Sequence, residues 1–172
     1  DKIMRGNNVV GIIFSNMHDD TMQQVTNIRT FGSVPFGGRY RTIDFPLSNM
    51  VNSGVNKVGV ITKSNYQSLM DHLGSGKAWD LSRKSEGLFI LPPFGNGNQM
   101  YNNRIEALDG ISSFLRNCNE EYVILSDCDM ICNIDFRKVL EAHLDTNADI
   151  TIVYKNSEMP ADLSEPVVLE LN

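Results

Sequence analysis

The sequence lacks an apolar run long enough to cross a bilayer, which takes about 20 residues. Its first residues, DKIMRGNN, contain no apolar core of the kind found in signal peptides. Cysteine is scarce: Cys118, Cys128 and Cys132 are odd in number and lack the spacing of a disulfide scaffold. We therefore expect a protein of the reducing cytoplasm with no membrane contact.

Positive charge is also in short supply. Lys and Arg number 15 against 21 Asp and Glu, which gives a formal net charge of −6 at pH 7. The basic residues are scattered, so we expect no nucleic-acid partner. With 172 residues and a hydrophobic fraction of 41%, the chain is large enough for one domain with its own core.

Short apolar runs alternate with amphipathic stretches along the chain. Such runs, rich in β-branched residues, are typical of parallel strands that are covered on both faces. They predict strands at Val9–Phe14, Val58–Thr62, Tyr122–Ser126 and Ile150–Tyr154. Helices are predicted between them, at Pro46–Ser53, from Ser64 to Gly74, at Arg104–Leu115 and from Asp135 onward. This alternation predicts an α/β domain with a mainly parallel sheet.

Local signals mark the ends of two of these helices. Asp44 is the expected cap of the helix that opens with Pro46 and stops at Gly54. Ser64 to Gln67 has the form of a capping box. Residues 74–103, rich in Gly, Pro and Asn, predict a long loop or short irregular strands beside a ligand crevice.

Residues 34–54, VPFGGRYRTIDFPLSNMVNSG, carry the most informative motif. The segment closely resembles PFGGKYRxIDFxLSNxxNSG of the glucose-1-phosphate adenylyltransferase (ADP-glucose pyrophosphorylase) family. The resemblance implies a three-layer α/β/α nucleotide-diphospho-sugar transferase domain of the GT-A-like kind, with a mainly parallel sheet. Residues 1–172 are then its N-terminal part, and the left-handed β-helix domain of the family is absent from this chain. We expect Asn49, Asn52 and Ser53 to hold the loop–helix junction by hydrogen bonds.

Other motifs of that family are degraded in this chain. Where the family has the phosphate-binding loop LAGGxGTRLxPLT, the paired glycines correspond to Asn16 and Met17, the later glycine to Asp19 and the arginine to Thr21. The lysine of RAKPAVPFGG corresponds to Phe31, which has neither a charge nor a donor. We therefore assign no catalytic residue. His18, in the same loop, is predicted to be a polar surface residue.

An acidic pair follows the predicted strand Tyr122–Ser126. Asp129 matches the family aspartate that binds Mg²⁺, and Asp127 points the same way if the strand continues. Both carboxylates are then candidate metal ligands, with Mg²⁺ as the cofactor if any activity remains. Alternatively, Asp127 caps the following turn and Asp129 is solvated.

Four further residues are candidates for substrate binding. Arg39 and Arg41 form the best anion site, although a solvated pair on an edge strand fits equally well. The segment GTADAV, which in the family resembled lines the nucleotide-sugar pocket, aligns with residues 103–108. Glu106 keeps the acidic position, but Arg104 and Ile105 replace small residues. Tyr101, just before it, is placed to stack on a base or sugar.

These features favour a D-type regulatory subunit of the family, as found beside a catalytic C-type subunit in Gram-positive bacteria, with weak or no catalysis of its own. Its expected partners are that C-type subunit in a hetero- or homo-oligomer and a nucleotide or sugar-phosphate ligand. An active enzyme making ADP-glucose and pyrophosphate from ATP and glucose 1-phosphate with Mg²⁺ is the alternative. A third interpretation, a Mn²⁺-dependent glycosyltransferase, explains the acidic pair but leaves residues 34–54 unexplained.

Overall fold

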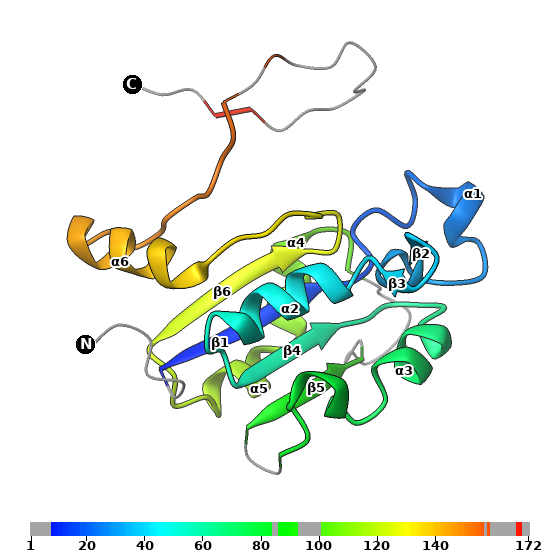
Figure 1. The fold of residues 1–172 in the computed structure, drawn as a ribbon, viewed down its shortest axis with the longest axis horizontal. Coiled ribbons are helices and arrows are strands. Elements are labelled where there is room, and N and C mark those ends of the chain that lie inside the picture. The colour runs from blue at the N-terminus through cyan, green and yellow to red at the C-terminus, as the bar shows by residue number, and fades with distance from the viewer. Residues whose placement is uncertain (1–7, 84–85, 93–100, 157, 159–167, 170–172) are drawn as a thin grey trace.

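A parallel sheet with helices on both faces forms the framework of the protein (Figure 1). The computed structural model describes residues 8–83, 86–92, 101–156, 158 and 168–169. The strand order is β5-β4-β1-β6, and the strands are β1 (Val9–Phe14), β4 (Lys57–Ile61), β5 (Gly87–Leu91) and β6 (Tyr122–Asp127). Each neighbouring pair in this sheet is parallel. The expected three-layer α/β/α architecture is confirmed.

Alternate residues of β1 supply the two cores. Val9 and Ile13 pack with one set of helices, which are α2 (Asp44–Asn52), α3 (Gln67–Leu73) and α6 (Phe136–Thr146). Val10 and Ile12 face the opposite layer, which consists of α4 (Arg104–Gly110) and α5 (Ser112–Arg116). This alternation follows from the period of two in a strand, so a strand buried on both faces is apolar throughout.

Helix α2 lies close to β1 because Gly11 has no side chain. A Cβ built on Gly11 would lie 2.4 Å from Sδ of Met50, a fully buried residue of α2. The helix ends where Gly54, with φ of 92°, takes a conformation that favours glycine. The stop predicted at Gly54 is therefore confirmed.

The predicted start signals of two helices are wrong. Asp44 lies inside α2, and its carboxylate accepts a bond from the Arg41 N–H at 3.0 Å and lies 2.6 Å from Nε2 of His72. His72 comes from α3 and Arg41 from the chain just before α2, and both compete with capping. The capping box from Ser64 to Gln67 does not form, because Asn65 has φ of 51° and α3 begins only at Gln67.

Two other segments differ from expectation. Ile150–Tyr154 forms no strand, and Ile150 is 80% exposed. The helix predicted over Arg104–Leu115 is divided at Ile111 into α4 and α5. Residues 74–103, predicted as a long loop or short irregular strands, contain β5 and the short helix η2 (Lys77–Trp79), while residues 84–85 and 93–100 lie outside the described residues.

Among the helices of the described residues, none has the length and apolar character that crossing a membrane requires. Cys118, Cys128 and Cys132 are all free, and Cys128 is buried where β6 ends.

Candidate functional site

The carboxyl ends of β1 and β6 lie side by side, since Phe14 pairs with Asp127 in the register. Several connecting segments meet at this edge: the loop over residues 15–22, the short helix η1 (Phe31–Ser33), the start of α4 and the turn after β6. In open α/β sheets, ligand crevices form at the carboxyl ends of the strands. We therefore take this edge as the candidate site.

The acidic pair after β6 faces a histidine from the loop after β1. Nε2 of His18 lies 3.1 Å from Oδ2 of Asp129 and 3.6 Å from Oδ2 of Asp127. One ligand atom from each of the three residues lies within 4.8 Å of the others. β6 ends at Asp127, but the carboxylates of Asp127 and Asp129 both lie next to the imidazole of His18. The carboxylates of Asp127 and Asp129 raise the pKa of His18 from 6.5 to about 9.

A second cation reaches the same pair from α4. Nε of Arg104 donates to Oδ1 of Asp127 at 3.1 Å, and its Nη2 donates to Oδ2. Burial alone would raise the pKa of Asp127, but the contacts with His18 and Arg104 lower it below its ordinary value. The two-pronged guanidinium contact is the geometry in which arginine binds carboxylates most strongly.

Tyr101 is fixed within this site by the loop after β1. Its hydroxyl donates to Oδ1 of Asn16 at 2.8 Å, and Nζ of Lys63 lies 5.7 Å from the ring centroid. Burial raises the pKa of the Tyr101 hydroxyl well above its ordinary value. The side chain of Asn16, at one of the family's glycine positions, thus bridges to the aromatic residue that we expected to stack on a ligand.

Phe31, at the family's lysine position, contacts His18. The two rings meet edge to face with centroids 5.6 Å apart. The carboxylate of Asp19 accepts the Phe31 N–H at 2.7 Å and so anchors η1 to the loop. Thr21, at the family's arginine position, is exposed and donates its hydroxyl to the His18 carbonyl at 3.1 Å. These contacts support His18 in its position beside the acidic pair.

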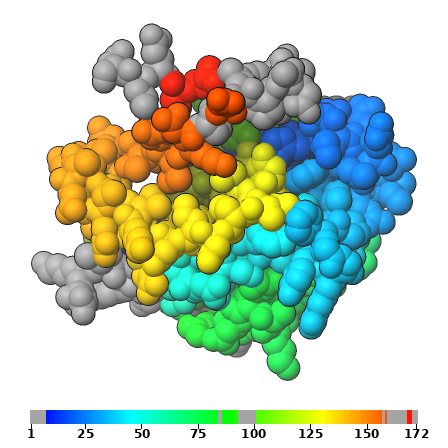
Figure 2. Space-filling view, turned by 45° about the horizontal axis from the view of Figure 1, so that its top comes forward, coloured from blue at the N-terminus to red at the C-terminus, as the bar shows by residue number. Residues whose placement is uncertain are grey.

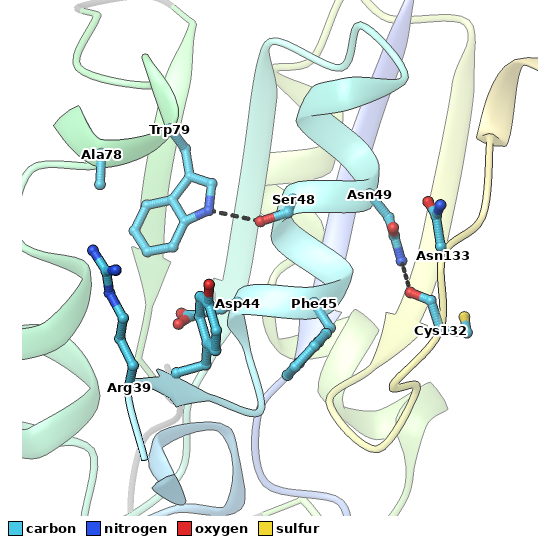
Figure 3. Close-up of a pocket in the computed structure, with 10 residues that line it drawn as sticks. Arg39, Asp44, Phe45, Ser48, Asn49, Ala78, Trp79, Cys132 and Asn133 are labelled. Carbon is cyan, nitrogen blue, oxygen red and sulfur yellow. Dashed lines mark hydrogen bonds between the residues drawn. The ribbon is translucent and has the colours of Figure 1, made fainter. Parts of the chain in front are cut away.

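Arg39 lies away from this edge, at a pocket on the outer side of α2 (Figure 3). The cavity measures about 520 Å³, and aromatic residues from separate segments, Tyr40, Phe45 and Trp79, line it. The indole N–H of Trp79 donates to Oγ of Ser48 at 3.1 Å. The predicted ligand residues Arg39 and Tyr101 therefore belong to two different places.

Two other predicted ligand residues hold the local structure. Arg41, from the hairpin of β2 (Pro35–Phe36) and β3 (Tyr40–Arg41), donates through Nη1 to the Ser33 carbonyl and to Oγ of Ser68. Glu106 accepts the N–H of Asn102 at 2.7 Å at the start of α4. Their role in ligand binding stays a prediction.

Residues of the family motif tie α2 to the chain that follows β6. Nδ2 of Asn49 donates to the Cys132 carbonyl at 2.9 Å (Figure 3), and Oγ of Ser53 accepts the Phe136 N–H at 2.9 Å. Figure 2 shows these two segments next to each other on the surface, α2 in cyan and the chain after β6 in yellow. The predicted structural role of Asn49 and Ser53 agrees with these bonds.

His18 and Arg104 were missed as site residues from the sequence. His18 was assigned to the surface, and Arg104 was noted only as a large residue where the family has a small one. A signal did exist, because both lie in family motifs that border the crevice, and both can carry positive charge opposite Asp127 and Asp129.

Comparison with known proteins matches residues 22–162 to the family model described as Nucleotidyl transferase. The glycogen biosynthesis protein GlgD of Bacillus subtilis is 38% identical over 90% of this chain and 46% of its own length. GlgD of Geobacillus stearothermophilus is 40% identical over 84% of the chain and 43% of its length. A glucose-1-phosphate adenylyltransferase of Clostridium perfringens is 37% identical over 88% of the chain and 39% of its length. The chain thus spans less than half the length of these relatives.

Proposed function

The chain belongs to the nucleotidyl transferase family, and from this premise we propose that it is part of a D-type regulatory subunit of glucose-1-phosphate adenylyltransferase that acts in glycogen synthesis. The resemblance predicted from residues 34–54 is confirmed at the level of the family. The names of the two GlgD relatives support the link to glycogen. In this proposal, the subunit has weak or no catalysis of its own and acts on a catalytic C-type partner.

The proposal rests on one observation: in and beside the loop after β1, side chains stand where the family has its phosphate-binding groups. Nucleotidyl transfer needs backbone N–H groups that approach the phosphates closely, together with cations that offset the developing charge. Here the side chain of Asn16 enters this region and bonds Tyr101, while the ring of Phe31 contacts His18. Loss of one preorganised donor typically costs about 3 kcal/mol, roughly a hundredfold in rate. In this chain a glycine loop, an arginine and a lysine are replaced together.

An active enzyme is the second candidate, because Asp127 and Asp129 approach each other at the carboxyl end of β6. The purified full-length protein decides between them in an assay with ATP, glucose 1-phosphate and Mg²⁺. We expect barely detectable ADP-glucose formation. A turnover of roughly one per second or more, the low end of ordinary enzymes, that Asp129→Asn abolishes would establish the enzyme and contradict the regulatory proposal.

The regulatory role itself requires a partner. Co-purification with the catalytic relative from the same organism is the first measurement. At saturating amounts, the full-length protein should change the kcat or effector response of that relative by about fivefold or more, the usual size of such couplings. Asp129→Asn should leave this effect intact, because the effect needs a competent fold and no turnover. Unchanged kinetics of the catalytic relative would overturn the proposal.

A further inference from the structure

We propose that His18 and Arg104 take the place of a divalent cation at the Asp127–Asp129 pair, so that this chain holds the pair without Mg²⁺. The inference rests on the proposed function in one respect, because a working transferase of this family would need the metal. In a subunit without catalysis, His18 and Arg104 would then occupy the part of the crevice where an active relative holds its metal.

Geometry is the first support. A cation that bridges the two aspartates must lie between their facing oxygens, and Nε2 of His18 already lies 3.1 Å and 3.6 Å from them. Nε2 is enclosed, so it occupies the space between the two carboxylates. Both oxygens of Asp127 are additionally bonded by Arg104. The oxygens that would coordinate a metal are therefore in contact with nitrogen donors of the chain.

Charge is the second support. The guanidinium of Arg104 lies on Asp127, so one of the two carboxylate charges is already offset within the chain, and the imidazole of His18 lies against both carboxylates. Mg²⁺ prefers oxygen ligands in octahedral geometry and gives up water reluctantly. A pair of carboxylates that is partly neutralised and already in contact with nitrogen atoms offers the ion little attraction. The residues present do not fit Mg²⁺ as they stand.

The surroundings of His18 are the third support. Phe31 occupies the family's lysine position and places its ring edge to face with the imidazole. Asp19, at a family glycine position, holds the backbone of Phe31. The residues that replaced the phosphate-binding groups thus position the imidazole that contacts Asp129. One arrangement accounts for several departures from the family motifs.

Titration with Mn²⁺ alone, monitored through the free ion by electron paramagnetic resonance, tests the proposal on the full-length protein. Wild type should show no Mn²⁺ binding that is lost in Asp129→Asn. The double variant His18→Gln with Arg104→Gln removes the guanidinium charge on Asp127 and the imidazole that lies against both carboxylates, and should bind Mn²⁺ at least about tenfold more tightly than wild type. Asp129→Asn in the double variant should abolish this gain. Arg116→Gln, a charge removal at the exposed end of α5, is the matched control and should change nothing.

Two results would overturn the inference. One is wild-type binding of Mn²⁺ that is lost in Asp129→Asn, and the other is a folded double variant that gains no binding. If the double variant does not fold, the single variant His18→Gln is titrated in its place. The comparison of wild type with Asp129→Asn tests the proposal whether or not the double variant folds. Failure here is distinct from failure of the regulatory role, since that role is measured on the kinetics of the catalytic partner without any use of metal on this chain.

Discussion

Replacing Asp127 by Asn distinguishes an internally paired carboxylate from an empty metal site by the sign of its effect on stability. In an empty metal site, two carboxylates repel each other, so the loss of one charge stabilises the protein. In this structure Asp127 is 15% exposed at the side chain and is paired with Arg104 and His18. Its removal leaves Arg104 without its partner and His18 with Asp129 alone, so the same substitution should destabilise the protein.

The structure also sets the size of the effect. Removal of one partner of a fully buried pair costs about 3–5 kcal/mol, and exposed pairs contribute about 0–1 kcal/mol. The pair lies between these limits, because Asp127 is largely covered while the side chain of Arg104 is 50% exposed. We expect Asp127→Asn to lower the free energy of unfolding by about 2 kcal/mol. Arg104→Gln should not add fully to it, because the two residues share one interaction.

Urea denaturation of the full-length protein at pH 7, followed by circular dichroism, measures this change. Asp145→Asn, on the exposed side of α6, is the control and should stay within about 0.5 kcal/mol of wild type. Equal or greater stability of Asp127→Asn would refute the reasoning. It would indicate that the two aspartates repel each other, as they do in a site built for a metal.

Three further outcomes follow from the same contacts. The stabilisation that His18 gives relative to His18→Gln should be complete below pH 6.5 and lost as pH rises through about 9, because folding raises the pKa of the imidazole; urea midpoints across this range test it. Glu120→Gln should cost about 3 kcal/mol of unfolding free energy in the same assay, because Nζ of Lys57, 3.1 Å from Oε2 of Glu120, is left buried without its partner. Restoring the glycine loop together with Thr21→Arg and Phe31→Lys should raise ADP-glucose synthesis above background, whereas single reversions do little; no gain from the combined variant would show that other losses also block the reaction.

The buried strands were predictable because their signal is local. β1 was predicted with its observed bounds, and β4 and β6 within one residue at their ends, since a strand covered on both faces is apolar throughout. The start of α6 was also predicted, and Asp135 caps it by accepting the N–H of Arg137 at 3.0 Å. The bounds of β5 were not predicted, because its five residues lie within a segment whose Gly, Pro and Asn content indicated only a long loop or short irregular strands.

Features that depend on partners distant in the sequence were not predictable. Asp44 has the residue type of a helix cap, but the imidazole of His72, from α3, contacts its carboxylate at 2.6 Å. Ile150–Tyr154 has the composition of a strand, yet strand formation needs a neighbour, and in the described part of the chain none pairs with it. The composition of a segment indicates whether it favours helix, strand or loop, and tertiary contacts determine which of these structures forms.

The candidate site shows the same limit. The acidic pair was found because it follows a strand, but its cations come from the loop after β1 and from α4. Their convergence requires β1 and β6 to be neighbours, and the strand pattern predicts parallel strands without their order. The roles of Asp127 and Asp129 in metal binding stay predictions that the Mn²⁺ titration addresses.

The departures from the family motifs are better understood as one rearrangement than as separate losses. His18 comes from the glycine loop, Phe31 from the lysine segment and Arg104 from the segment that lines the pocket, yet all three belong to one chain of contacts that ends on Asp127. Random loss of catalytic groups would leave the aspartates exposed to each other's charge. Here cations from two of the altered segments meet that charge, and an aromatic ring from the third supports one of them. If the regulatory proposal holds, an acidic pair whose contacts come from within the chain needs neither metal nor substrate, and this suits a subunit whose fold, and not its chemistry, acts on a partner.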